Sequence, residues 1–192
     1  MLVLVVGPSG AGKDTLMAAA RGRLPEPGRF RFVQRDITRP AEAGGEDHLA
    51  VDVARFAARR AAGGYALAWE AHGLFYGIPT DIAEDIAVGR VVVANVSRAV
   101  IAEAAARFAV IVLEITAPAE VLAGRLAARG REEAADVVRR LARSVSLPKG
   151  VDVARVMNDG SVEDGAARVA AVLSRAAQSA RQARTAPAGP SG

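Results

Sequence analysis

Seven residues near the start of the chain have the composition and spacing of a phosphate-binding loop. The stretch reads G-P-S-G-A-G-K and fits the pattern G-x-x-x-x-G-K. Its glycines allow the backbone to turn tightly and to direct N–H groups at phosphate oxygens, and the lysine reaches the terminal phosphates. The positive end of the following helix adds to this attraction. We therefore expect ATP to bind at Gly7, Pro8, Ser9, Gly10, Ala11, Gly12 and Lys13, with Lys13 as a catalytic residue.

The residue after Lys13 departs from the usual pattern, which has a Ser or Thr whose hydroxyl binds magnesium. Here Asp14 follows the lysine, and Thr15 comes next. A carboxylate at a helix N-terminus is favourable by itself, because it interacts with the helix dipole. A carboxylate is equally a hard oxygen ligand for Mg²⁺, bound directly or through water. Both interpretations stay open, and Asp14 and Thr15 are the candidate metal ligands.

The elements that must position this loop can be predicted from the pattern of the chain. A continuous aliphatic run before the loop is typical of a buried parallel strand. Further along, aliphatic strands alternate with helical stretches, which predicts an α/β fold with a parallel sheet covered on both faces. We expect strands at 2–6, 30–36, 65–70, 91–94, 109–115 and 153–157, and helices at 14–23, 51–62, 80–88, 97–107, 118–130, 132–146 and 161–182.

The length of 192 residues predicts one domain, which we expect at 1–183. Residues 37–90 are the least regular part and predict an inserted lobe, whereas 184–192 are rich in Pro, Gly, Ser and Ala and predict a disordered tail. A capping box formed by Ser161 and Asp164 is expected to open the last helix.

Composition excludes several classes of protein. The chain has no cysteine and two histidines, which argues against disulfides and zinc sites. Aromatic residues make up 4%, too few for base-stacking platforms, so a nucleic-acid partner is not expected. The first residues lack a basic segment before their short apolar run, and no stretch has the length of a membrane span, so we expect a cytoplasmic protein without a membrane partner.

The net charge of +4 comes almost entirely from arginines, because Lys13 and Lys149 are the two lysines. Arginine suits phosphate recognition, although a coding bias explains many of these residues equally well.

Two further motifs follow the phosphate loop. Thr38-Arg39-Pro40 precedes a Gly-Gly-Glu run at 44–46, and 69–77 read W-E-A-H-G-L-F-Y-G. With the loop, these motifs resemble the guanylate kinase family in order and spacing, over roughly residues 2–175. The resemblance implies a P-loop kinase fold with a parallel-sheet core flanked by helices, an inserted acceptor-binding lobe at 37–90 and a helical lid at about 125–143. It also implies that Arg39 and Tyr76 hold the phosphate of the acceptor.

The departures from that family concern the residues that read guanine. The corresponding positions hold Arg35, Leu67, Ile78 and Asn95, which are mostly apolar or cationic. A pocket without partners for the edges of a base should not select that base. Arg35 and Arg98 instead suggest a second phosphate on the acceptor.

One branch of the superfamily, the ribose 1,5-bisphosphate phosphokinases, resembles the chain more closely. The shared features are Lys-Asp at 13–14, the run at 37–46, the W-x-A-H-G-L-x-Y-G-I run at 69–78, and N-x-S-R at 95–98. The resemblance implies transfer of a phosphoryl group from ATP to ribose 1,5-bisphosphate, giving 5-phosphoribosyl 1-diphosphate and ADP in phosphonate breakdown. The implied partner is a small phosphorylated sugar, with the protein a monomer or homodimer. His72 then contacts the sugar or a phosphate, or is an ordinary packed or surface histidine.

Arginines cluster in the predicted lid. Arg125 and Arg129 are four residues apart and share a helix face, and we expect them to be catalytic by stabilising the transferring group. Pairing with nearby acidic residues is the alternative. Asn158-Asp159, after the last strand, resembles the turn beside the adenine, and a plain capping turn is the alternative. An acceptor that is itself a phosphate needs no general base, because its oxygen is already anionic.

Two rival functions stay open: a nucleoside monophosphate kinase and a non-catalytic binding module.

Overall fold

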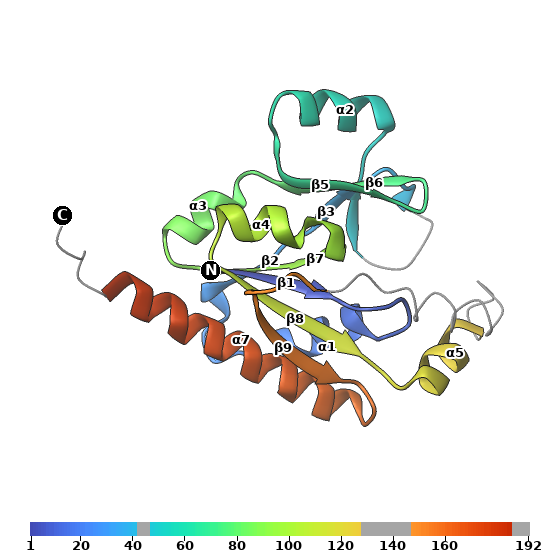
Figure 1. Ribbon diagram of the computed structural model, residues 1–192, viewed down its shortest axis with the longest axis vertical. Coiled ribbons are helices and arrows are strands. Elements are labelled where there is room, and N and C mark those ends of the chain that lie inside the picture. Colours follow the sequence, from blue (N-terminus) through green and yellow to red (C-terminus); the bar gives the residue numbers. More distant parts are fainter. Residues whose placement is uncertain (42–46, 128–146, 186–192) are drawn as a thin grey trace.

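The computed structural model describes residues 1–41, 47–127 and 147–185, and these residues form two sheets with helices around them (Figure 1). The core sheet has the strand order β2-β7-β1-β8-β9, and every neighbouring pair in it is parallel. Its strands are β1 (Leu2–Val6), β2 (Phe30–Phe32), β7 (Val91–Asn95), β8 (Val110–Thr116) and β9 (Asp152–Met157). The predicted parallel α/β core is confirmed.

The aliphatic run at the start of the chain forms the central strand, as expected. All five residues of β1 are buried, and β1 lies between β7 and β8. Because alternate side chains of a strand point to opposite faces, Val3 and Val5 pack into one hydrophobic core while Leu2 and Leu4 pack into another. A strand buried on both faces needs apolar residues at every position.

Helices cover both faces of the core sheet. On one face lie α1 (Lys13–Arg21) and the long α7 (Val162–Thr185), which bury Leu16 and Leu173 against the sheet. On the other face lies α4 (Ile101–Arg107), which directly follows the 3₁₀ turn η3 (Arg98–Val100). Further helical elements are the 3₁₀ turn η1 (Pro27–Arg29), α3 (Ile82–Ala87) and α5 (Ala119–Ala127).

A second, smaller sheet has the order β4-β3-β6-β5 and carries helix α2 (Val53–Ala61) on its outer side (Figure 1). Its strands are β3 (Arg35–Ile37), β4 (His48–Ala50), β5 (Tyr65–Ala71) and β6 (Leu74–Pro79). β5 and β6 form an antiparallel hairpin joined by His72 and Gly73, whose φ values are 54° and 71°. Two consecutive residues with positive φ are typical of the turn that matches the twist of a tight hairpin.

The structure corrects the expected strand at 30–36. The segment divides into two strands that belong to different sheets, with Val33 and Gln34 between them. β2 pairs with β7 of the core, whereas β3 pairs with β4 and β6 of the small sheet. The residues at 33 and 34, Val and Gln, give no sign of the change of partner.

Helix boundaries differ from expectation at several places. The helix expected at 51–62 begins at Val53, because Asp52 caps it by accepting a hydrogen bond from the Arg55 N–H at 2.7 Å, and a strand precedes it. The sequence does not predict strand β6.

The capping box at the start of α7 is confirmed: the Asp164 N–H donates to Ser161 Oγ at 3.1 Å. Helix α7 continues to Thr185, two residues into the expected tail. The helix expected at 132–146, most of the predicted lid and residues 186–192 lie outside the described residues.

Among the described residues, no helix combines the length and the apolar character needed to cross a membrane.

Candidate active site

The phosphate loop connects the end of β1 to the start of α1 and has the backbone that the sequence predicts. Gly7, Gly10 and Gly12 have φ values of 147°, 82° and 82°, in the region that favours glycine. A Cβ at Gly7 would lie 1.9 Å from the carbonyl oxygen of Ile115 on β8. Glycine at this position is therefore required both by the conformation and by the close approach of β8.

Lys13 folds back over this loop. Its Nζ donates to the carbonyl oxygens of Gly7 at 2.9 Å and of Pro8 at 3.1 Å. The ammonium group is thereby held at the loop. The first residues of α1, Asp14 and Thr15, are exposed beside it.

Two side chains from distant parts of the chain brace the loop. Asn158, which follows β9, is buried, and its side-chain amide donates to the carbonyl oxygen of Ala11 at 2.8 Å. Its backbone N–H donates to Thr116 at the end of β8 at 2.7 Å. Arg125 of α5 donates from Nη1 to the carbonyl oxygen of Gly10 at 3.3 Å. The sequence predicts that both residues contact ATP, and the structure brings both to the loop itself.

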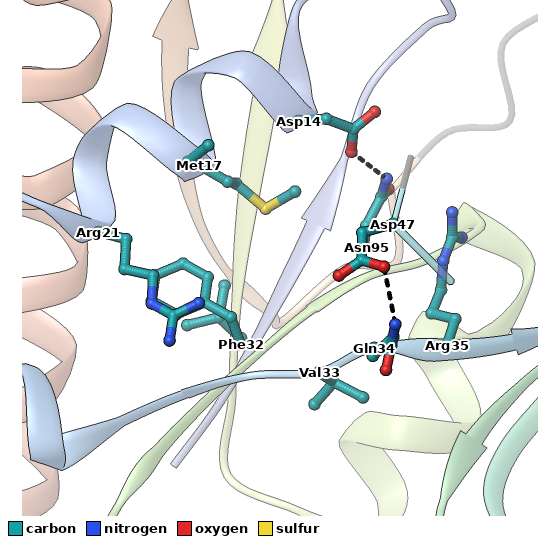
Figure 2. Close-up of a pocket in the computed structure, with 11 residues that line it drawn as sticks. Asp14, Met17, Arg21, Phe32, Val33, Gln34, Arg35, Asp47 and Asn95 are labelled. Atoms are coloured by element: carbon teal, nitrogen blue, oxygen red, sulfur yellow. Dashed lines mark hydrogen bonds between the residues drawn. The ribbon is translucent and has the colours of Figure 1, made fainter. Parts of the chain in front are cut away.

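Asp14 meets a polar residue at the end of the neighbouring core strand. Asn95 at the end of β7 donates from Nδ2 to Asp14 Oδ1 at 3.2 Å (Figure 2). The contact joins the start of α1 to the carboxyl end of β7, the edge of a parallel sheet at which α/β proteins bind ligands. Exposed oxygen atoms of Asp14 and Asn95 therefore lie close to the phosphate loop.

A pocket of about 250 Å³ opens below this pair, between α1 and the segment that carries β2 and β3 (Figure 2). It is lined by Asp14, Met17, Ala18, Arg21, Phe32, Val33, Gln34, Arg35, Asp47, Val93 and Asn95. Gln34 donates to Asp47 across it at 2.8 Å, and the Arg21 guanidinium lies 5.7 Å from the centre of the Phe32 ring. The sequence interpretation missed Arg21. Its spacing of seven residues from Asp14 on one helix was an available signal, because such residues share a face.

Arg35, one of the predicted acceptor ligands, is 8% exposed and lies over two aromatic rings. Its guanidinium carbon is 5.8 Å from the centre of the Trp69 ring and 5.2 Å from that of Tyr76. The two rings stack on each other with their centres 5.3 Å apart and their planes 5° from parallel. The predicted Arg35 and Tyr76 thus come together, and cation–π attraction keeps a buried cation in place.

Arg39 lies on the same segment, just after β3. Its Nη2 is 3.4 Å from Nδ1 of His48, and Nε2 of the same imidazole is 3.1 Å from the Arg39 carbonyl oxygen. The preceding Thr38 is fixed to β6, since its hydroxyl oxygen accepts from the Phe75 N–H at 2.8 Å. Arg39 is therefore held next to the strand that carries Tyr76.

A buried network backs this arrangement from the α2 side. Asp36 is 1% exposed and accepts hydrogen bonds from the Tyr65 hydroxyl at 2.6 Å and from Arg59 of α2 at 2.8 Å. Burial, followed by this hydrogen bond to a carboxylate, raises the pKa of the Tyr65 phenol well above its usual value. The network ties β3, β5 and α2 together directly behind Arg35 and Arg39.

Of the predicted acceptor ligands, Arg35 lines the pocket, whereas Arg39, Tyr76, His72 and Arg98 are not among the described residues that line it. His72 is exposed at the tip of the β5–β6 hairpin. Arg98 pairs with Glu114 at 2.7 Å, and Arg155 donates to the other oxygen of the same carboxylate at 2.8 Å. Arg129 lies outside the described residues. Within the described ranges, no group of three or more His, Cys, Asp or Glu residues could hold a metal ion without other ligands.

Comparison with solved structures defines the class to which this fold belongs. The chain superposes on a guanylate kinase from Anaplasma phagocytophilum with a TM-score of 0.64 and 19% identity, covering 91% of this chain and 84% of that one. At this identity the likeness concerns the fold, which is that of the guanylate kinase-like P-loop kinases. No family model matches the sequence.

Curated relatives give the family. The chain is 47% identical over 175 residues to the ribose 1,5-bisphosphate phosphokinase PhnN of Rhizobium etli, covering 90% of this chain and 89% of that protein. The enzyme of the same name from Methylobacterium radiotolerans is also 47% identical over 175 residues, with 90% and 96% covered. The chain belongs to the ribose 1,5-bisphosphate phosphokinase family. It is 48% identical over 183 residues to a bifunctional ribose 1,5-bisphosphokinase-thymidine phosphorylase of Azorhizobium caulinodans, and spans 26% of that longer protein.

Proposed function

We propose that this protein transfers the γ-phosphoryl group of Mg-ATP to the 1-phosphate of ribose 1,5-bisphosphate, giving 5-phosphoribosyl 1-diphosphate and ADP. A 1-phosphate oxygen forms the new bond to the γ-phosphorus, while the bond from that phosphorus to the bridging oxygen of ADP breaks. The attacking oxygen is already anionic, so no general base is needed. We further propose that the reaction serves phosphonate breakdown, a role that the family resemblance of the sequence supports.

The observation that carries this proposal is the pair of arginines on one short segment of the small sheet. Arg35 is buried over the Trp69 and Tyr76 rings, and Arg39 follows four residues later with its guanidinium beside His48. Two guanidinium groups suit an acceptor with two phosphates, because each matches the geometry of a phosphate. Leu67 and Ile78, which face each other across β5 and β6, are fully buried and present no polar atoms to a base. These two buried apolar residues stand where the guanylate kinase family reads guanine, which supports a phosphorylated sugar over a guanine nucleotide.

The donor side of the reaction uses the loop and the start of α1. The N–H groups of 7–13 and the Lys13 ammonium would hold the ATP phosphates, with Arg125 beside them. The residues present fit a magnesium ion, because Mg²⁺ takes one or two protein oxygens and completes its shell with waters and substrate phosphates. Asp14 and Thr15 would supply these oxygens, and the ion would neutralise charge on the transferring group.

The test is a direct comparison of acceptors. The purified protein is incubated with Mg-ATP and with ribose 1,5-bisphosphate, GMP or other nucleoside monophosphates, and ADP and the phosphorylated product are measured. We expect turnover on the bisphosphate with little on the nucleotides. Arg35→Ala and Arg39→Ala should raise KM for the bisphosphate, while Arg60→Ala, an exposed arginine of α2, serves as the matched control. Efficient turnover on GMP would refute the acceptor assignment, and ATP binding without turnover on any acceptor would indicate a non-catalytic module.

A further inference from the structure

His48 contacts both ends of one residue, which is an unusual arrangement for a histidine in an edge strand. Its Nδ1 is 3.4 Å from the guanidinium Nη2 of Arg39, and its Nε2 is 3.1 Å from the carbonyl oxygen of the same arginine. His48 is buried at the start of β4, opposite Arg35 in the parallel pairing of β4 with β3. The ring therefore bridges the side chain and the backbone of Arg39.

The chemistry of the two Arg39 groups constrains the form of the imidazole at these two contacts. A guanidinium group can only donate hydrogen bonds, and a carbonyl oxygen can only accept them. Nδ1 must therefore carry a lone pair toward Arg39 Nη2, and Nε2 must carry the proton that is donated to the Arg39 carbonyl. The neutral ring with its proton on Nε2 meets both requirements, whereas the other neutral tautomer and the imidazolium each place a proton against the guanidinium.

Arg39 is held in place by His48, but not all of its hydrogen-bond donors are used. Its Nε is buried, and no hydrogen-bond partner for it is present among the described residues. The guanidinium carries five N–H donors, of which His48 engages a single one. A guanidinium already oriented before the ligand arrives loses less side-chain entropy on binding an anion.

We propose that His48 is a positioning residue that orients Arg39 for the acceptor phosphate through its unprotonated Nδ1. This role rests on the proposed function, since it assumes that Arg39 binds a phosphate of the acceptor. His48 itself does not donate to the phosphate: its one N–H is directed at the Arg39 carbonyl. Loss of His48 therefore weakens acceptor binding through Arg39 and leaves the phosphoryl-transfer step intact.

The kinetic test uses His48→Asn and His48→Phe with Arg39→Ala and the double variant His48→Phe/Arg39→Ala. The side-chain oxygen of Asn takes the place of the accepting Nδ1, whereas Phe keeps the ring without its nitrogens. We expect His48→Phe to raise KM for ribose 1,5-bisphosphate about tenfold with little change in kcat, and His48→Asn to restore most of this loss. In the double variant, the loss should equal that of Arg39→Ala.

Three kinetic outcomes would overturn the proposal. They are an unchanged KM in His48→Phe, no recovery in His48→Asn, and losses that multiply in the double variant as they would if His48 bound the phosphate independently. Thermal melting of each variant shows whether it folds, and a variant that melts like the unsubstituted protein is used for the comparison.

A second measurement needs no turnover and so separates this proposal from the acceptor assignment. The chain contains two histidines, His48 and His72, so ¹⁵N spectra of the imidazole nitrogens are simple and a His72→Gln variant assigns them. We expect the His48 ring to carry a proton on Nε2 and none on Nδ1, and its Nδ1 resonance to move in Arg39→Ala. A proton on Nδ1, or a resonance insensitive to Arg39→Ala, would refute the positioning role even in a fully active enzyme. The expected spectrum in a protein that does not phosphorylate the bisphosphate would leave the Arg39–His48 pairing standing and refute the function.

Discussion

The phosphate loop and the small sheet are held in place by different kinds of contact. The loop depends on its own backbone: glycines with positive φ, a lysine folded onto Gly7 and Pro8, and carbonyl oxygens that accept from Asn158 and Arg125. The small sheet instead orients its arginines through other side chains, with Arg35 on stacked rings and Arg39 on His48. A phosphate that every ATP presents can be bound by backbone, whereas a particular acceptor requires side chains that differ between enzymes.

The largest expected effect concerns the loop. Lys13→Ala removes the ammonium group that neutralises the transferring phosphoryl group, and kcat should fall by about 100- to 1,000-fold. Lys149→Ala is the matched control, because Lys149 is the one other lysine and is exposed. Initial rates of ADP formation measure the effect, and circular dichroism checks the fold. A folded Lys13→Ala protein with normal activity would remove the loop from the catalytic site.

A smaller effect is expected from the backbone of the same loop. Gly7→Ala places a methyl group against the Ile115 carbonyl in a conformation that alanine avoids, which should lower the free energy of unfolding by about 1–3 kcal/mol and weaken ATP binding. Gly28→Ala is the control, since no atom lies within 4 Å of the added methyl. Urea unfolding and ATP titration give the two values. Equal stability of both variants would contradict the tight approach of β8 to the loop.

Between the two regions lies Asp14, whose carboxylate accepts from Asn95. If it binds the magnesium ion, Asp14→Ala should raise the Mg²⁺ concentration for half-maximal activity about tenfold, and Glu84→Ala, at an exposed site on α3, should not. Activity measured against free Mg²⁺ at fixed ATP gives the answer. An unchanged magnesium requirement would assign Asp14 to the helix end instead.

The smallest effect is expected behind the acceptor arginines. Tyr65→Phe removes one donor to the buried Asp36 and should cost about 1 kcal/mol of stability. The pKa of the Tyr65 phenol is raised in the folded protein, foremost by burial and then by Asp36. The Tyr65 hydroxyl therefore contributes its full share of stability below about pH 10, where an unfolded tyrosine titrates. This stabilisation is lost as the pH rises toward the pKa of Tyr65 in the folded protein. Urea unfolding across the alkaline range should show a shallower decline in Tyr65→Phe; identical pH profiles would contradict this account.

The sequence predicted the loop and the core sheet well because both rest on local signals. A buried parallel strand reads as an aliphatic run, and the loop as glycines at fixed spacing, as β1 and 7–13 illustrate. Arg35, Arg39, Tyr76, Arg125 and Asn158 were also singled out, and the structure brings them to the loop or to the small sheet.

The pairings within the small sheet could not be predicted, because they depend on contacts between distant residues. Strand β6 contains Gly77 and Pro79 and has no simple alternation, yet it pairs on both sides, and a Cβ at Gly77 would lie 2.4 Å from the Tyr65 ring. The Arg39–His48 contact joins residues nine positions apart, and the Arg98–Glu114 pair joins an η3 residue to β8. No periodicity in the chain specifies such partners.

The division of 30–37 between two sheets has a mechanical consequence. β2 is hydrogen-bonded to β7, and β3 to β6, so Val33 and Gln34 form a short link between the two sheets. The Val33 N–H is itself bonded to the Val93 carbonyl at 2.9 Å, two residues before Asn95. Any tilt of the small sheet against the core sheet would therefore turn about Val33 and Gln34, next to β7, which ends at Asn95 beside Asp14. The link thus connects the position of the acceptor arginines to the edge of the core sheet where the phosphate loop lies.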